Sequence, residues 1–257
     1  MNYIQAAFLG IIQGLTEFLP ISSSGHLVIM QYLMGIQNSE LTFEVLVHFA
    51  TLLAVIAIYR RDIIELLKKP FQHYNYLIIA GTIPTAIIGL SFEEQFEKMF
   101  STVKIVGFML IITGILLFIA EYLSRKNQFK SNSDNFNYLH AVVIGIGQGL
   151  AITPGISRSG ITIALGLMLG LSRSSAAKYS FLLSIPAVLG ATILKCRDLI
   201  ILNEANLNLS SYLVGAVFAG ISGYFAIKIL LKILHSKKLS YFSIYCWTVG
   251  LLLLIFT

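Results

Sequence analysis

One short stretch of the chain, residues 10–26, carries side chains that could do chemistry within an otherwise apolar sequence. It reads GIIQGLTEFLPISSSGH and contains one carboxylate, Glu17, and one histidine, His26. The carboxylate could bind a divalent cation, hold the histidine or act as a base. His26 closely follows three serines and is within reach of activating one of them as a nucleophile. This combination favours a catalytic site, and helix packing by hydrogen bonds is the alternative.

A second stretch, residues 145–160, repeats the first with an offset of 135 residues and no gap. It reads GIGQGLAITPGISRSG. The two copies differ where Ile152 stands in place of Glu17 and Arg158 in place of Ser23. The chain therefore contains an internal duplication, and its two halves contribute different chemical groups.

Arg158 is the charged residue of the second stretch. A charge at membrane depth costs about 2.5–3.5 kcal/mol, so such a residue is usually paired or functional. The guanidinium group suits two-pronged contact with a phosphate. It also precedes a predicted helix, and the N-terminus of a helix attracts anions. The alternative is a structural ion pair between Arg158 and Glu17.

The composition is that of an integral membrane protein. Of the 257 residues, 56% are apolar and only 12% are charged, about half the share in a soluble domain. The length accommodates about six to eight membrane segments. The net charge of +6 is explained by basic loops on the cytoplasmic side, so nucleic acid is not an expected partner. Cys196 and Cys246 form no metal-ligand pattern, and the N-terminus does not have the features of a signal peptide.

The predicted fold is an all-α polytopic membrane protein made of two inverted-topology repeats. Each repeat has a re-entrant helical hairpin followed by three transmembrane helices. The first hairpin has arms at residues 3–19 and 26–34, both too short to span alone, and breaks at Pro20. The second covers residues 139–171 and turns at 154–160. The six spans are expected at residues 43–59, 77–92, 103–122, 181–194, 212–234 and 241–257.

We expect one membrane domain over residues 1–257, with halves 1–124 and 136–257 joined by a polar loop at 125–135. The basic loops indicate the cytoplasmic side, and they lie at residues 60–74, 123–138, 172–180 and 235–240. The loops at 93–102 and 195–211 then lie outside, as do both termini. Because three crossings separate the hairpins, the halves are inverted, and the two tips are expected to meet near the bilayer midplane.

Other polar residues of the spans carry weaker predictions. Gln13 and Gln148 are interpreted as hydrogen bonders. Glu44 and His48 lie four residues apart on one face of a span and could support the site, although a satisfied interior pair is the expectation. Glu121 lies near a span end and is expected to reach the membrane interface.

An anion cradle, a nucleophile, a base and a cation ligand at membrane depth predict a phosphate-handling site that is reached from the lipid. A substrate with a long apolar tail and a phosphorylated head suits such a site. The sequence has no Walker A motif and no dinucleotide fingerprint, so ATP and NAD are not suggested.

The two motifs resemble those of a known family. QGLTEFLPISSSGH at residues 13–26 and PGISRSG at residues 154–160 are similar to the signatures of the undecaprenyl-diphosphate phosphatases, the bacitracin-resistance proteins of bacterial membranes. Length, span pattern and spacing also match, so the resemblance covers essentially the whole chain.

The resemblance implies hydrolysis of undecaprenyl diphosphate to undecaprenyl phosphate, the recycled lipid carrier of peptidoglycan synthesis, with a divalent cation, Mg²⁺ or Ca²⁺. It implies location in the bacterial plasma (inner) membrane. It points to four catalytic residues, with Glu17 also the metal ligand: Glu17, Ser23, His26 and Arg158. The residues expected around the substrate head group are Gln13, Ser22, Ser24, Gly25, Ser157, Ser159 and Gly160. Many members of the family have Glu where this chain has Gln13. A metal clamp of two carboxylates is therefore not expected here, and more of the metal binding would fall to Glu17.

These residues suggest a hypothetical reaction. Arg158 and the N–H groups of the tip hold the diphosphate, and a cation near Glu17 shields its charge. Ser23, helped by His26, attacks the terminal phosphorus, and water then releases the enzyme. In an alternative mechanism without a covalent step, His26 activates water directly. A polyprenyl-phosphate transporter on the same inverted repeat is the rival function. The expected partners are the polyprenyl diphosphate lipid and bilayer lipids, and a homodimer is left open.

Overall fold

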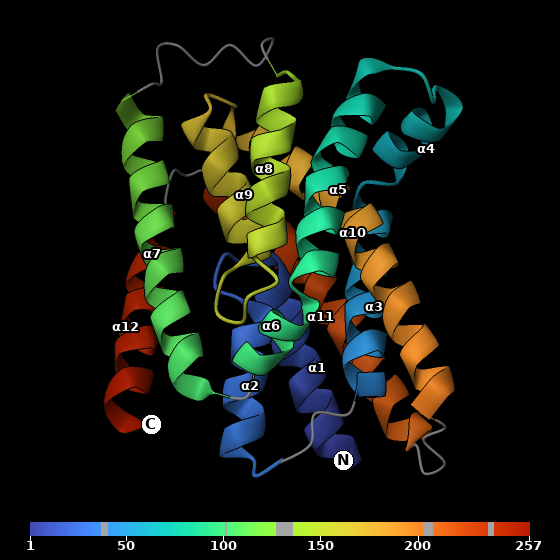
Figure 1. Cartoon of the computed structure of the whole chain (residues 1–257), viewed down its shortest axis with the longest axis vertical. Coiled ribbons are helices and arrows are strands. Elements are labelled where there is room, and N and C mark those ends of the chain that lie inside the picture. The colour runs from blue at the N-terminus through green and yellow to red at the C-terminus, as the bar shows by residue number, and fades with distance from the viewer. Residues whose placement is uncertain (37–40, 101, 127–135, 203–207, 236–238) are drawn as a thin grey trace.

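Helices make up the computed structural model of this chain, which describes residues 1–257 except 37–40, 101, 127–135, 203–207 and 236–238. No strand occurs within that described part. Figure 1 shows the helices side by side around two short hairpins. In chain order they are α1 (Tyr3–Phe18), α2 (Ser23–Leu33), α3 (Leu41–Ile58), α4 (Arg60–Lys68), α5 (His73–Ser91), α6 (Glu93–Met99), α7 (Val103–Lys126), α8 (Tyr138–Leu150), α9 (Arg158–Met168), α10 (Arg173–Leu202), α11 (Leu209–His235) and α12 (Ser240–Phe256).

The helix–turn–helix expected for the first hairpin is confirmed and consists of α1, a short turn and α2. Asn2 starts α1 with a capping box that pairs it with Gln5. Helix α1 ends at Phe18, just before Pro20, whose ring cannot continue a helix. The side chain of Ser22 then caps α2 by accepting from the N–H of Gly25. The arms have 16 and 11 residues, which is short for a bilayer crossing.

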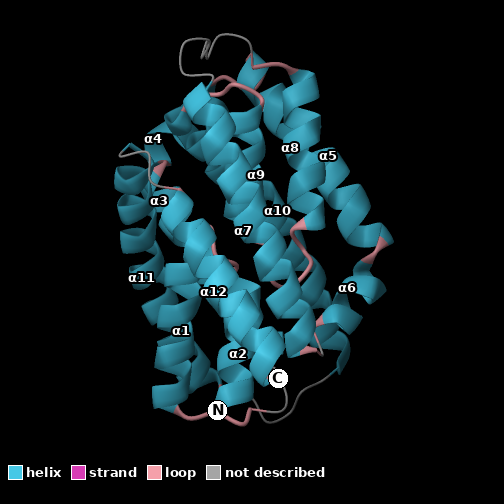
Figure 2. Ribbon diagram, turned by 90° about the vertical axis from the view of Figure 1, so that its left-hand side faces the viewer, coloured by secondary structure: helices cyan, strands magenta, loops and turns pink. Residues whose placement is uncertain are grey.

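The second hairpin is built in the same way from α8 and α9. Asn137 caps α8, and Ser157 caps α9 by accepting from the N–H of Gly160. The turn between them passes through Gly155 at φ 93°, in the left-handed region that glycine enters without a Cβ clash. Figures 1 and 2 show α1 and α2 at the end of the molecule where both termini lie, and α8 and α9 at the opposite end.

The longer helices agree with the predicted spans. By length and apolar composition, α5, α7, α10 and α11 could each cross a membrane, and α3 with α4 makes a fifth candidate that bends by 79°. Helix α12 is apolar but has only 17 residues, slightly fewer than the ~20 that a straight crossing needs. The structure therefore supports a multi-pass membrane protein with four or five clear candidate spans.

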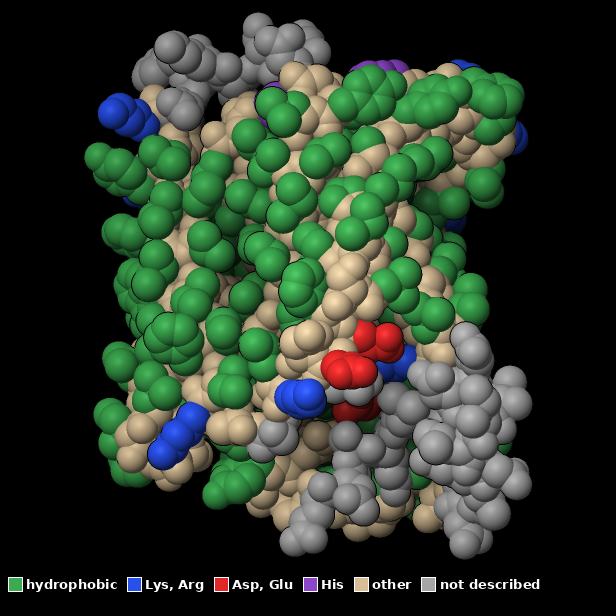
Figure 3. Space-filling model, viewed as in Figure 1, with side chains coloured by type: hydrophobic (Ala, Val, Ile, Leu, Met, Phe, Trp, Pro, Cys, Tyr) green, Lys and Arg blue, Asp and Glu red, His purple; other side chains and the backbone are tan. Residues whose placement is uncertain are grey.

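The outer surface is apolar over most of its height. Large side chains such as Ile79, Leu90, Phe225 and Leu252 are about half or more exposed on the long helices. On the face in Figure 3, hydrophobic side chains cover the middle, and charged ones lie towards the two ends. A surface of this kind is suited to lipid tails, because a water-facing surface would leave this apolar area unburied.

Glycines bring the hairpin helices close to their neighbours. A Cβ at Gly10 of α1 would lie 2.1 Å from the backbone oxygen of Gly215 in α11. A Cβ at Gly145 of α8 would likewise lie 2.1 Å from the oxygen of Gly81 in α5. Such close backbone packing is common in membrane helix bundles. It fixes each hairpin against one long helix and so sets the positions of the two tips.

Several sequence-based expectations were wrong. The stretches at 60–74 and 93–102, expected to be loops, contain helices α4 and α6. Ile63 and Leu66 of α4 pack against the main core, which explains why this charged segment is ordered. The basic segment 172–180 is mostly the start of α10, and the same helix continues to Leu202, into the expected loop at 195–211. Residues 127–135 of the joining loop, 203–207 of the loop at 195–211 and 236–238 of the last basic loop lie outside the described residues.

Glu121 also departs from its prediction. Its carboxylate is buried, with the residue only 3% exposed, instead of reaching the interface. It forms ion pairs with Arg125 at 2.8 Å and with Arg173 at 2.9 Å. These pairs join the end of α7 to the start of α10, and they explain how a carboxylate can be buried there.

Candidate active site

The tips of the two hairpins lie against one another. The hydroxyl of Ser159, in the first turn of α9, donates to the backbone oxygen of Leu19 at 3.2 Å. A Cβ on Gly160 would be 3.3 Å from Pro20, and one on Gly25 would be 3.2 Å from Gly155. Glycines at these points allow the close approach of the two turns. The polar residues of both motifs therefore share one region of the protein.

Glu17 is the centre of this region, and its side chain is only 7% exposed. One carboxylate oxygen, Oε1, accepts from Nη2 of Arg158. The other, Oε2, accepts from the Ser23 hydroxyl at 2.5 Å and from the Gln13 amide at 3.0 Å. Nε2 of His48 lies 3.8 Å from the same oxygen. A buried carboxylate needs such partners, because an unpaired charge inside a protein is very costly.

The ion pair with Glu17 occupies only one of the two terminal nitrogens of the Arg158 guanidinium. The pair exists, as the structural alternative requires. However, Nη1 of the same guanidinium is buried and has no hydrogen-bond partner among the described residues. A buried charged donor without a partner calls for an explanation, and a missing ligand is one. Arg158 therefore anchors Glu17 and has a second, buried nitrogen that an anion could bind.

The first tip is held in an unusual backbone conformation. Ser22 has φ 69°, and among the described residues it is the one non-glycine with positive φ. Its hydroxyl lies 3.3 Å from that of Ser24 and caps the helix at Gly25. Strain of this kind is often found at functional sites. It places Ser23 at the first position of α2, with its hydroxyl directed at Glu17.

The ring nitrogens of His26 bond groups other than the Ser23 hydroxyl. Its Nδ1 lies 2.7 Å from the backbone oxygen of Ser22, and its Nε2 lies 2.7 Å from the phenol oxygen of Tyr245 in α12. The carboxylate of Glu17, not the imidazole, is the group that accepts from Ser23. The nearest base to the candidate nucleophile is thus Glu17.

Residues outside the motifs support the second tip, and the sequence did not reveal them. Thr113 of α7 donates to the backbone oxygen of Gly155 at 2.9 Å and accepts from the N–H of Ser157 at 3.2 Å. The Ser157 hydroxyl lies 3.3 Å from that of Ser159. A threonine in an apolar span carries no sequence signal of such a role.

His48 was assigned to the wrong partner. Its Nδ1 bonds the backbone oxygen of Glu44, while the Glu44 carboxylate lies 3.9 Å from Lys195. The expected side-chain pair between Glu44 and His48 is therefore not formed. Instead, His48 faces Glu17, so it belongs to the site. The spacing of four residues places Glu44 and His48 on one face of the helix, but it does not show which residues that face contacts.

The two equivalent glutamines of the repeat bond different partners. Gln13 donates to Glu17, and its Oε1 is buried with no partner among the described residues. Gln148 instead bonds Thr85 at 3.3 Å and the backbone oxygen of Leu183 at 3.4 Å, away from the carboxylate. Both are hydrogen bonders, as expected, but only Gln13 contacts the site.

A divalent cation fits this arrangement only with help from a substrate. No group of three or more His, Cys, Asp or Glu side chains suited to a metal occurs in the part of the chain that the structure describes. The protein oxygens that could bind a cation include those of Glu17 and the Oε1 of Gln13, which is buried and has no hydrogen-bond partner among the described residues. Mg²⁺ is commonly held by one or two carboxylates together with substrate phosphates, and this donor set suits that mode.

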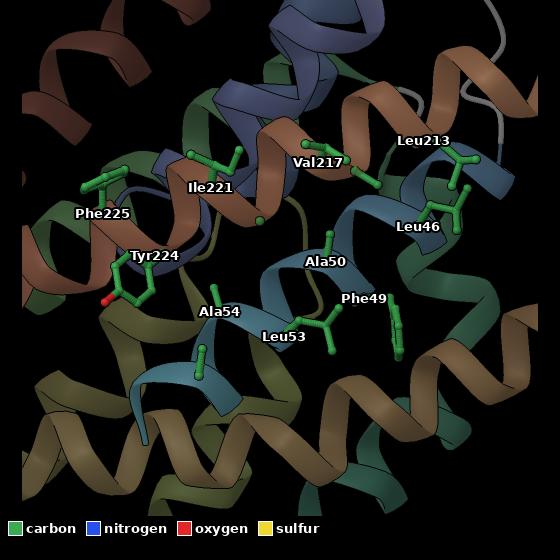
Figure 4. Close-up of a pocket in the computed structure, with 13 residues that line it drawn as sticks. Leu46, Phe49, Ala50, Leu53, Ala54, Leu213, Val217, Ile221, Tyr224 and Phe225 are labelled. Carbon is green, nitrogen blue, oxygen red and sulfur yellow. The ribbon is translucent and has the colours of Figure 1, made fainter. Parts of the chain in front are cut away.

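A separate apolar groove lies between α3 and α11 (Figure 4). Its volume is about 730 Å³, and its walls are almost entirely hydrocarbon, with Phe49, Leu53 and Val217 among the lining residues. None of the candidate site residues lines it. It is therefore distinct from the polar site at the tips.

Comparisons with known proteins agree with the motifs. Residues 6–252 match the family described as bacitracin resistance protein BacA. The chain is 47% identical to an undecaprenyl-diphosphatase of Halothermothrix orenii, covering 99% of this chain and 98% of that protein. It is 46% identical to an undecaprenyl-diphosphatase of Carboxydothermus hydrogenoformans, covering 99% and 97%. A match of this extent shows that the chain belongs to the bacitracin resistance protein BacA family.

Proposed function

We propose that this protein is a membrane phosphatase that hydrolyses undecaprenyl diphosphate to undecaprenyl phosphate and inorganic phosphate. This reaction would recycle the lipid carrier of peptidoglycan synthesis and confer resistance to bacitracin. The observation that carries the proposal is the buried Nη1 of Arg158, which has no hydrogen-bond partner within the described part of the chain and lies beside a carboxylate that also bonds a serine hydroxyl. The names of the full-length relatives support the same substrate.

The chemistry follows from the contacts of Glu17. As Ser23 attacks the terminal phosphorus, its proton passes to the carboxylate that already accepts its hydrogen bond. The bridging P–O bond breaks, and undecaprenyl phosphate leaves. Water then cleaves the phosphoserine and releases inorganic phosphate. Arg158 and the N-terminus of α9, with its serines, hold the negative charge throughout.

His26 has a second role in this scheme. It acts as a base for the attacking water, either on the phosphoserine or, in the variant without a covalent step, on the diphosphate itself. A divalent cation held by Glu17, Gln13 and the substrate would neutralise phosphate charge. The head-group positions proposed for Ser22, Ser24, Gly25, Ser157, Ser159 and Gly160 rest on their places in the two tips.

The proposed architecture is a pair of inverted repeats in one membrane domain. Helix α1 packs on α11 as α8 packs on α5, through close glycine contacts in both pairs, which is the reciprocity that inverted halves would produce. The basic segments at the start of α4, the end of α7 and the start of α10 lie at the end opposite the termini in Figure 1. We therefore propose that both termini face outward from the plasma membrane.

The decisive experiment measures phosphate release from a polyprenyl diphosphate by purified protein in detergent or nanodiscs, with and without a divalent cation. Arg158→Ala is compared with the wild type, and Lys104→Ala, at an exposed position of α7, is the matched control for loss of a positive charge. Cation-dependent release by the wild type and the control, but not by Arg158→Ala, supports the proposal.

Absence of release by folded wild type that still binds the lipid would overturn the hydrolase in favour of the transporter. The transporter is not favoured at present, because the relatives carry the name of a diphosphatase.

A further inference from the structure

Tyr245 touches the site although no motif contains it. It lies in α12, 219 residues after His26 in sequence, and its phenol oxygen is 2.7 Å from Nε2 of His26. The two rings also stack, with centroids 5.7 Å apart and planes inclined by 12°. The last helix of the chain therefore contributes a side chain to the first hairpin.

The direction of both hydrogen bonds at His26 follows from their partners. The backbone oxygen of Ser22 can only accept, so Nδ1 carries a proton and donates to it. In the neutral ring, Nε2 then has a lone pair and accepts from the O–H of Tyr245. Two bonds on opposite sides fix the rotation of the imidazole and its tautomer.

The surroundings hold Tyr245 in place. The next residue, Cys246, is buried, and its sulfur lies 3.7 Å from the backbone oxygen of Pro20 in the first tip. Four residues further on, Gly250 of α12 packs directly on the backbone of Gly107 in α7. These contacts lock α12 against both the tip and α7. The phenol group thus meets His26 in a defined geometry.

We propose that Tyr245 is a positioning residue of the hydrolytic site. The Ser22 carbonyl selects the tautomer with an unprotonated Nε2, and the Tyr245 hydroxyl fixes the rotation of the ring and so the position of that nitrogen. A histidine can take up a proton at Nε2 only in that tautomer, because the other form has no lone pair there. In the structure, the O–H of Tyr245 donates a hydrogen bond to this nitrogen. During the reaction, the attacking water replaces the phenol and donates its own O–H to Nε2. This inference rests on the proposed phosphatase function and on His26 as its base.

The test is a double-mutant cycle between Tyr245→Phe and His26→Ala, read as phosphate release from a polyprenyl diphosphate. Tyr245→Phe keeps the stacked ring and removes only the hydroxyl. We expect kcat to fall roughly 3- to 10-fold, the effect of one hydrogen bond, with little change in KM. In the His26→Ala background the same change is expected to have no further effect on kcat. Tyr122→Phe, at an exposed tyrosine of α7, is the matched control.

Two results would overturn the proposal. One is wild-type kcat in Tyr245→Phe. The other is an equal loss of kcat with and without His26, since a general structural defect would act in both backgrounds.

A second measurement does not depend on activity. In protein labelled with ¹⁵N at histidine, the His26 ring of the wild type should show a protonated Nδ1 and an unprotonated Nε2 whose resonance is shifted by the hydrogen bond from Tyr245, and Tyr245→Phe should lose that shift. An unchanged spectrum in the variant would refute the role of Tyr245. Lack of phosphate release by the wild type would instead refute the proposed function, so the two failures can be told apart.

Discussion

Replacing Arg158 by lysine separates the two tasks that the structure gives to its guanidinium. Nη2 pairs with Glu17, and Nη1 is buried without a partner among the described residues. Lysine keeps the positive charge but offers one nitrogen in place of the fork. That nitrogen can satisfy the Glu17 carboxylate or a phosphate oxygen at its best geometry, but not both. The variant should therefore fold normally and bind the transition state poorly.

The expected size follows from the bond that is lost. A hydrogen bond to a charged group contributes about 1.5–3 kcal/mol, so kcat/KM for phosphate release should fall by roughly 10- to 150-fold. The thermal stability of Arg158→Lys should remain near that of the wild type. Arg158→Ala should unfold at a clearly lower temperature, because it leaves the buried Glu17 carboxylate unpaired at a cost of about 3–5 kcal/mol.

The assay measures kcat/KM with a polyprenyl diphosphate and the unfolding temperature in the same detergent. Arg61→Lys, at an exposed position of α4, is the matched control and should leave both values unchanged. A value of kcat/KM for Arg158→Lys within twofold of the wild type would refute the idea that Nη1 binds the substrate. Equal unfolding temperatures for the lysine and alanine variants would refute the pairing argument.

Three further changes test other parts of the site and fold. Ser23→Ala should lower kcat by about 10²-fold or more if the serine is the nucleophile, and near-wild-type turnover would leave only direct attack by water. Thr113→Val removes two hydrogen bonds from the second tip, one of them to Gly155, so the free energy of unfolding should fall by about 1–3 kcal/mol; an unchanged melting temperature would contradict this. Gly145→Ala should destabilise the protein severely, because its Cβ would lie 2.1 Å from a backbone oxygen of α5, whereas Gly190→Ala, in open space, should be tolerated; similar melting temperatures for the two would show that α8 can move.

The two hairpins and the contact between their tips could be predicted because the same motif occurs twice in the sequence. Pro20 and the serine caps break each hairpin at a local signal that needs no tertiary information. The offset between the copies then relates Ser23 to Arg158 although they are far apart in sequence. Local signals combined with the duplication were therefore enough to bring Glu17 and Arg158 together.

The rest depended on how the long helices cross. Tyr245, Thr113 and His48 lie in apolar spans where one tyrosine, threonine or histidine looks like another. Which of them faces the tips is decided by helix rotation, which close contacts such as the one between Gly107 and Gly250 determine. For the same reason, the burial of Glu121 was missed, because its second arginine comes from a different helix.

The structure also explains why the two copies had to diverge. Ser23 and Arg158 are equivalent in the repeat, and each is the first residue of the second helix of its hairpin. Both donate to the same carboxylate, Glu17, through different oxygens. Its counterpart, Ile152, is 37% exposed and approaches Gly89 of α5. A symmetric site would have set two carboxylates or two arginines against each other, at the cost of like-charge repulsion in a buried place. With one carboxylate, one hydroxyl and one guanidinium, the duplicated tips instead make a single asymmetric site in which both partners bond the same carboxylate.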